Sequence, residues 1–278
     1  KIVWSQGAEY RIGDLPAVGF SGDYYHRPAF IHGEWLEFDG CVMFVDPSGK
    51  GMDETAYAIV AQLNGNLFVL EVGSFREGYT EPVLEGLAQA AKRQEVNLII
   101  LEDQFGQGML QSLLQPYLRR IYPCTVEPAR SNVQKERRII NALEPVMNQH
   151  RLIVNRSVIE NDSKAKDEDS VETHLAYQLF HQLTHLTVDR NSLQHDDRLD
   201  ALAGAVEYWN DSLAIDEEIA MRERDMELLD LEIAAYNGEI VGALDATILG
   251  ISLDELPQSE TEEGWIELQG FENQSLGN

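Results

Sequence analysis

The sequence is short of cysteine and of long apolar runs. Only Cys41 and Cys124 occur among 278 residues, and they do not form a C-x-x-C pair. This excludes a disulfide framework and a cysteine zinc site, and it is typical of a reducing compartment. No apolar stretch approaches the roughly 18 residues of a membrane span, and the first residues lack the pattern of a secretory signal. We therefore expect a globular protein that is neither secreted nor membrane-embedded.

The chain is also short of positive charge, with 21 Lys and Arg against 48 Asp and Glu and a formal net charge of -27. Such a balance argues against nucleic acid as a partner, because phosphate groups attract lysine and arginine. The deficit is uneven, however, because residues 211–278 hold 18 acids and two arginines. Residues 119–156 reverse the sign, with eight bases against three acids. One segment is therefore basic enough to contact a phosphate backbone.

Periodicity predicts an α/β domain that follows an irregular start. Residues 1–39 show no sustained period and are interpreted as a linker or a strap over the domain. Tight turns and short apolar runs then indicate strands, three of them in a meander, and 3.6-residue periods indicate helices. The predicted strands span 41–45, 55–63, 67–75, 97–101, 122–129 and 152–155, and the predicted helices span 81–94, 108–120, 133–150 and 171–186.

The stretch HDDRLDALAGAV places three aspartates, Asp196, Asp197 and Asp200, at the start of an otherwise apolar helix. At 100° per residue they share one face, opposite Leu199 and Leu202. Aspartates in a first helical turn often serve only as caps and partners of the helix dipole. The alternative is that the cluster holds a cation, because closely spaced carboxylates repel one another unless they face water or a positive charge.

Two further acids favour the interpretation that the aspartate cluster binds a cation. Asp46 and Glu102 each stand where an apolar strand ends and a loop begins. If those strands are neighbours in one sheet, the two carboxylates converge, and a helix across that edge brings an aspartate to meet them. Three carboxylates from separate elements suit magnesium or manganese. Asp53 and Glu54, close after the first acid, are either supporting groups or surface residues.

Four stretches in the same order carry a resemblance to a known family: FVDPSGKGMDE, LIILEDQFGQGM, QKERRIINALEPVMNQHRLIV and LQHDDRLDALAGAVEYW. Together they resemble the nuclease domain of the large terminase subunit, the DNA-packaging motor protein of tailed bacteriophages, of the short-tailed coliphage and cyanophage type. The resemblance implies a ribonuclease H-like mixed sheet flanked by helices. It also implies a two-metal endonuclease that cuts concatemeric double-stranded DNA with Mg²⁺ or Mn²⁺.

Carried over by position, the resemblance assigns catalysis to Asp46, Glu102 and Asp197, with Asp196 and Asp200 as supporting metal ligands. Helical spacing at 100° per residue leaves Asp196 and Asp197 equally able to face the metal, and only the resemblance favours Asp197. On the basic amphipathic helix, Lys135 and Arg138 are expected to face solvent. We expect Lys135, Arg137, Arg138 and Arg130 to contact the DNA backbone, with a merely solvated face as the alternative.

The resemblance also predicts the domain organisation and the partners. Residues 1–39 are expected to link to an N-terminal ATPase domain that this chain lacks, because no GxxxxGK[ST] stretch occurs. The nuclease domain is expected over 40–212, and an acidic helical or irregular tail over 213–278. Expected partners are double-stranded DNA, the ATPase domain, the portal ring and the small terminase subunit, in the host cytoplasm and transiently on the procapsid, with no membrane contact.

Other interpretations stay open from the sequence alone. A phosphotransferase or ATPase of the actin and sugar-kinase type also begins with an acid and a glycine turn, and a non-catalytic acidic module that binds a partner protein would explain the tail. His174, His181 and His185 form a stripe on the predicted helix over 171–186, which is either a solvated face or an incomplete zinc site. His195 is either a polar residue at a helix start or a phosphate contact.

Overall fold

The fold is seen in a computed structural model, which describes residues 2–5, 7–15, 19–20, 22–34, 36–47, 54–102, 108–130, 133–164 and 171–213, with residues 226 and 229. The chain divides into two compact units, Lys1–Ile215 and Asp216–Asn278. Everything below concerns the first unit. The expected acidic tail over 213–278 lies almost wholly outside the described residues, and its boundaries stay a prediction.

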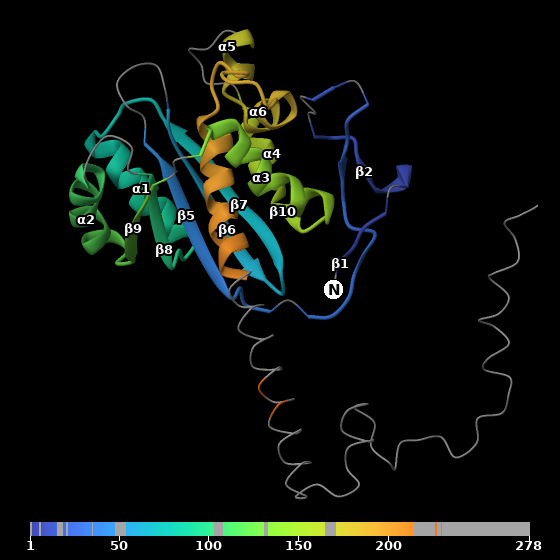
Figure 1. Cartoon of the computed structure of the whole chain (residues 1–278), viewed down its shortest axis with the longest axis horizontal. Coiled ribbons are helices and arrows are strands. Elements are labelled where there is room, and N and C mark those ends of the chain that lie inside the picture. Colours follow the sequence, from blue (N-terminus) through green and yellow to red (C-terminus); the bar gives the residue numbers. More distant parts are fainter. Residues whose placement is uncertain are drawn as a thin grey trace, which may run out of the picture. The chain divides into compact units, whose positions relative to one another are not determined.

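A six-stranded mixed sheet forms the centre of this unit (Figure 1). The strand order is β10-β7-β6-β5-β8-β9, with β5–β6 and β6–β7 antiparallel and the other three pairs parallel. The expected meander is therefore present, and the expected edge strand is β10. The strands are β5 (Gly40–Asp46), β6 (Thr55–Leu63), β7 (Asn66–Phe75), β8 (Leu98–Glu102), β9 (Thr125–Ala129) and β10 (Leu152–Val154).

Helices cover both faces of the sheet, so the predicted α/β class is confirmed. On one face, α1 (Glu81–Arg93) and α2 (Met109–Ile121) pack over one core cluster. On the other, α3 (Lys135–Asn148), α4 (Arg156–Asp162), α6 (Leu179–His185) and the helix over 197–213 pack over a second cluster. In Figure 1 the helix over 197–213, drawn in orange, crosses the face of the sheet.

Side-chain alternation along the strands decides where the acids lie. In β5, Val42 and Phe44 contribute to the cluster beneath the helix over 197–213, whereas the intervening residues face α1 and α2. Asp46 follows Phe44 by two residues and so lies on the face of the sheet beneath the helix over 197–213. Glu102 follows Ile100 on β8 in the same way and lies on the same face. Because β5 and β8 are parallel neighbours, both carboxylates emerge at the same edge and on the same face.

Close packing brings the helix over 197–213 onto that face. A Cβ at Gly204 would lie 2.5 Å from Cζ of Phe44, so only glycine allows the helix this near to β5. Further along, the indole Nε1 of Trp209 donates a 3.0 Å hydrogen bond to the carbonyl of Val60, where the register between β6 and β7 shifts. The bond gives a polar group at this irregularity a partner.

The start of the chain has more regular structure than its sequence indicates. It contains the short helix η1 (Ala8–Tyr10), a ladder of β1 (Ile2–Val3) with β4 (Phe30–Ile31), and a ladder of β2 (Arg11–Ile12) with β3 (Tyr25–His26).

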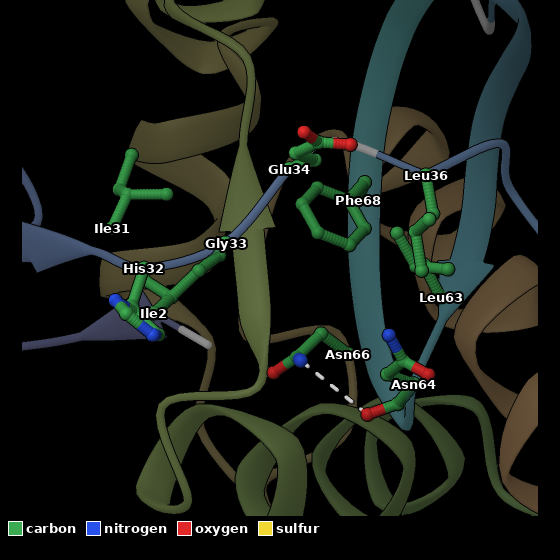
Figure 2. Close-up of a pocket in the computed structure, with 10 residues that line it drawn as sticks. All are labelled: Ile2, Ile31, His32, Gly33, Glu34, Leu36, Leu63, Asn64, Asn66 and Phe68. Atoms are coloured by element: carbon green, nitrogen blue, oxygen red, sulfur yellow. Dashed lines mark hydrogen bonds between the residues drawn. The ribbon is translucent and has the colours of Figure 1, made fainter.

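This segment and the β6–β7 turn line a pocket of about 410 Å³ at the end of the sheet opposite Asp46 (Figure 2). Its lining includes Phe68, Leu36 and Ile2, and Asn66 donates a 3.4 Å hydrogen bond to the carbonyl of Asn64. Among the described residues that line it, Glu34 is the only carboxylate.

The prediction of one continuous helix over 171–186 is wrong. The structure has α5 (Val171–Ala176) and α6, and Gln178 between them is extended at φ -74° and ψ 130°. Asp162 explains the new start, because its carboxylate accepts hydrogen bonds from the backbone N–H groups of Leu179 and Phe180, at 2.8 and 3.1 Å. A buried carboxylate from α4 thus caps α6, a non-local contact that periodicity does not reveal.

Candidate metal centre

Three carboxylates from separate elements meet at the edge where β5 and β8 end. Asp46 and Glu102 are the last residues of their strands, and Asp200 lies in the first turn of the helix over 197–213. Each offers one oxygen, and these atoms all lie within 4.8 Å of one another. All three residues are buried, with Asp200 fully so. The structure thus brings together two predicted catalytic residues and one predicted supporting ligand.

Asp197 and Asp196 lie beside this trio but outside it. Asp197 accepts a 3.3 Å hydrogen bond from the backbone N–H of Glu54, and its charge raises the pKa of Asp46. Asp196 precedes the helix, and its carbonyl accepts the N–H of Asp200 at 2.8 Å. The carboxylate of Asp196 turns instead to the ammonium group of Lys135, at 2.9 Å.

The expectation that Arg138 faces solvent is wrong. Its side chain is 5% exposed and its guanidinium pairs with Asp200 and, at 3.4 Å, with Glu102. The reason is the position of α3, whose buried residues include Glu136, Arg138 and Ile139. An arginine on this buried face reaches the acids rather than water.

Lys135, one helical turn earlier, also points into the acidic cluster. Its ammonium group lies 3.0 Å from Asp200 and 3.7 Å from Asp46, as well as near Asp196. The side chain is one-third exposed, so it sits at the mouth of the centre. Of the predicted DNA contacts, Arg138 is therefore an internal counterion, Lys135 pairs with the acids from the mouth, and Arg137 and Arg130 are exposed.

The electrostatics of the centre are dominated by uncompensated negative charge. Burial is the largest effect on Asp46 and raises its pKa well above the usual range; Lys135 opposes the shift, and Asp200, Glu102 and Asp197 reinforce it. Burial likewise raises the pKa of Asp200, against the lowering effect of Lys135 and Arg138. Carboxylates outnumber the two cations Lys135 and Arg138 here, because Glu207 also acts on Arg138 alongside the five acids already described.

The donor set fits a hard divalent cation. All candidate ligands are carboxylate oxygens, which magnesium and manganese prefer over nitrogen or sulfur. Oε2 of Glu102 is buried and has no hydrogen-bond partner within the structure. A buried carboxylate oxygen without a donor is costly, and a cation at this position would satisfy it.

Sequence reasoning missed the structural importance of Glu54. The residue is fully buried, and its carboxylate receives Arg76 and Arg198, each through Nε at 3.0 Å. The sequence offered one weak signal, an acid just before a strand close to Asp46. Neither arginine partner is detectable from sequence, because Arg198 lies 144 residues away.

The predicted histidine stripe is divided by the break between α5 and α6. His181 and His185 remain together on α6, with ring centroids 4.0 Å apart, while His174 on α5 contacts Gln178. His195 is buried and stacks on Tyr177 at 4.0 Å. Among the described residues, none of these histidines belongs to a cluster of three or more groups close enough together to hold a metal ion.

Comparisons with known proteins show what the central segment is similar to. Residues 45–152 match the family model described as the ribonuclease H-like domain of the bacteriophage T7 terminase. The chain is also 34% identical over 213 residues to the terminase large subunit of enterobacteria phage T3, covering 77% of this chain and 36% of that protein. The chain therefore spans about a third of the length of the curated relative that it matches.

Two solved structures are also similar. The nuclease domain of the human cytomegalovirus terminase, soaked with manganese and bound to an inhibitor, is 13% identical, with a TM-score of 0.47, over 64% of this chain and 86% of that one. The nuclease domain of the large terminase subunit gp2 of bacterial virus Sf6 is 15% identical, with a TM-score of 0.38, over 62% of this chain and 90% of that one.

Proposed function

Because residues 45–152 match the ribonuclease H-like domain of the bacteriophage T7 terminase, we propose that this chain is the metal-dependent endonuclease domain of a viral DNA-packaging terminase. Its reaction is hydrolysis of phosphodiester bonds in concatemeric double-stranded DNA. The observation that carries the proposal is the buried trio of Asp46, Glu102 and Asp200, with a net negative charge and an orphaned carboxylate oxygen.

The proposed ligands divide the work according to position. Asp46, Glu102 and Asp200, whose carboxylate oxygens lie within 4.8 Å of one another, would hold the ions. Asp197 is proposed as the further ligand that the family resemblance indicated, and Asp196 as support. Two Mg²⁺ or Mn²⁺ ions supply activation of water and stabilisation of the leaving oxygen.

The charge of the centre agrees with this assignment. The carboxylates of the centre outnumber its cations, and divalent ions would offset this excess of negative charge. Arg138 neutralises part of the charge on Glu102 and Asp200 from within the fold. Lys135 at the mouth and the exposed Arg137 and Arg130 are proposed to contact the DNA backbone.

The partners follow from the proposed role. We assign an N-terminal ATPase domain, the portal ring and the small terminase subunit as the assembly in which the nuclease acts, in the host cytoplasm and transiently at the procapsid. No helix among the described residues has the length and apolarity needed to cross a bilayer. With few exposed bases, the isolated domain should bind DNA weakly and lose binding steeply as salt rises.

Plasmid nicking tests the proposal. The parent is expected to convert supercoiled plasmid to nicked and linear forms with Mg²⁺ or Mn²⁺ and to stop in EDTA. Asp46→Asn and Asp197→Asn are expected to lose at least a hundredfold in rate, while Glu144→Gln, an exposed acid on α3, cuts like the parent.

Two results would argue against the proposal. If Asp46→Asn and Asp197→Asn cut as fast as the parent, the site is wrong. ATP-dependent thermal stabilisation without DNA cleavage would instead favour the phosphotransferase alternative.

A further inference from the structure

A second ionic network lies beside the acidic centre, around the fully buried Glu54. Arg76, the residue that follows β7, donates through Nε to one carboxylate oxygen at 3.0 Å, and Arg198 donates through Nε to the other at 3.0 Å. Arg198 also donates to Asp162 at 3.1 Å and to Ser74 at 3.0 Å. A buried carboxylate held by two guanidinium groups is fixed in position, because either loss would leave a buried charge uncompensated.

This network contacts the residues on both sides of Asp196 and Asp197, which are His195 and Arg198. On the C-terminal side, Arg198 is tied to Glu54. On the N-terminal side, His195 stacks on Tyr177, and the guanidinium of Arg76 lies 4.2 Å from the centre of the same Tyr177 ring. Arg76 therefore joins the two flanks, since it contacts both Glu54 and the aromatic stack. The segment between the flanks consists of Asp196 and Asp197.

Glu54 also contacts the segment directly. Its backbone N–H donates a 3.3 Å hydrogen bond to Oδ2 of Asp197, which turns that carboxylate toward the start of β6. Asp46 pairs with Ala56 across β5 and β6, two residues from Glu54, so the bond ties Asp197 to the strand that borders the metal trio. The orientation of Asp197 thus depends on where Glu54 is held.

We propose that Glu54 is a positioning residue, which through Arg76, Arg198 and its own backbone N–H holds the carboxylate of Asp197 in place to bind the metal. The inference rests on the proposed function, because it assumes that Asp197 is a ligand. Glu54 itself does not touch the ion; it acts on metal affinity through Asp197. Groups that hold ligands in this way typically change metal affinity by about 10- to 100-fold when removed.

A double-mutant cycle tests this proposal. Mn²⁺ affinity is measured by isothermal titration calorimetry for the parent, Glu54→Gln, Asp197→Asn and the double variant. Glu54→Gln is expected to weaken binding by about 10-fold, and to have no further effect once Asp197 is already Asn. Glu71→Gln is the matched control, because it removes a partly buried carboxylate that Arg93 binds at 3.2 Å, away from the metal trio.

Three results would overturn the proposal: unchanged Mn²⁺ affinity in Glu54→Gln, an equal loss in the Asp197→Asn background, or an equal loss in the Glu71→Gln control. The second result would mark Glu54 as a purely structural group. If circular dichroism shows that Glu54→Gln is unfolded, Arg198→Lys replaces it in the same cycle, since lysine keeps the charge but loses the two-pronged contact. Asp46→Asn separates failure of this proposal from failure of the proposed function. If the trio does not bind metal at all, Asp46→Asn will bind Mn²⁺ like the parent.

Discussion

Replacing Arg138 by methionine should expose the electrostatic cost of the acidic centre. The guanidinium lies between Glu102 and Asp200, and the three side chains are 5%, 2% and 0% exposed. At 3.4 Å and an effective dielectric near 20, a single unit pair is worth about 5 kcal/mol before desolvation. Breaking a buried pair typically costs about 3–5 kcal/mol, and we expect the lower end because Lys135 still faces Asp200 at 3.0 Å.

The assay is urea denaturation at pH 8, with EDTA and with excess Mn²⁺. In EDTA, Arg138→Met should lose about 3 kcal/mol of unfolding free energy. At a hundred times its dissociation constant, Mn²⁺ stabilises a single-site protein by about 2.7 kcal/mol. The variant should gain more than the parent at equal Mn²⁺ concentration, because its centre carries one more uncompensated negative charge.

Arg137→Met is the matched control, since this neighbour on α3 is exposed. It should change stability by less than about 0.5 kcal/mol in either buffer. The reasoning is refuted if Arg138→Met loses less than about 1 kcal/mol in EDTA, or if Mn²⁺ stabilises parent and variant equally.

Three further predictions concern the frame around the centre. Burial raises the pKa of Glu71, but hydrogen bonds, led by the one from Arg93, outweigh burial and lower the pKa below 4.5. Glu71→Gln should therefore lose about 1 kcal/mol of unfolding free energy at neutral pH. The difference between parent and variant in urea unfolding should shrink below about pH 4.5, where the unfolded chain takes up the proton. Gly204→Ala should lose about 1–3 kcal/mol in thermal melts and weaken Mn²⁺ binding, because the new methyl group meets Phe44 and displaces the helix. Trp209→Phe should lose about 1–3 kcal/mol in urea unfolding, because a buried strand carbonyl loses its donor; parent-like stability would show that water replaces the indole.

The parts of the site that could be predicted are those that local patterns specify. Asp46 and Glu102 end apolar strands, and parallel neighbouring strands bring such residues to one edge whatever the rest of the chain does. Alternation along β5 likewise predicts which face each side chain takes. The position of Asp200 follows from helical periodicity, although its burial does not.

The remaining features depend on partners that are distant in sequence. The sequence predicts that Arg138 faces solvent. Periodicity indicates which residues share one face of α3, but it does not indicate that this face packs against the acids. The break between α5 and α6 depends on Asp162, and the burial of Glu54 depends on Arg198. Buried charges are tolerated only where a counterion arrives from elsewhere in the fold, so the sequence near each charge carries little information about it.

The spacing of the trio along the chain has a consequence for folding. Asp46, Glu102 and Asp200 come from the first, fourth and last of the elements that build the central sheet and its covering helix, so long loops must close before any two meet. A partly folded chain, or one still emerging from the ribosome, therefore has scattered acids and no centre. If the trio holds metal as proposed, that capacity would arise only when the helix over 197–213 docks, and metal binding would then report complete folding.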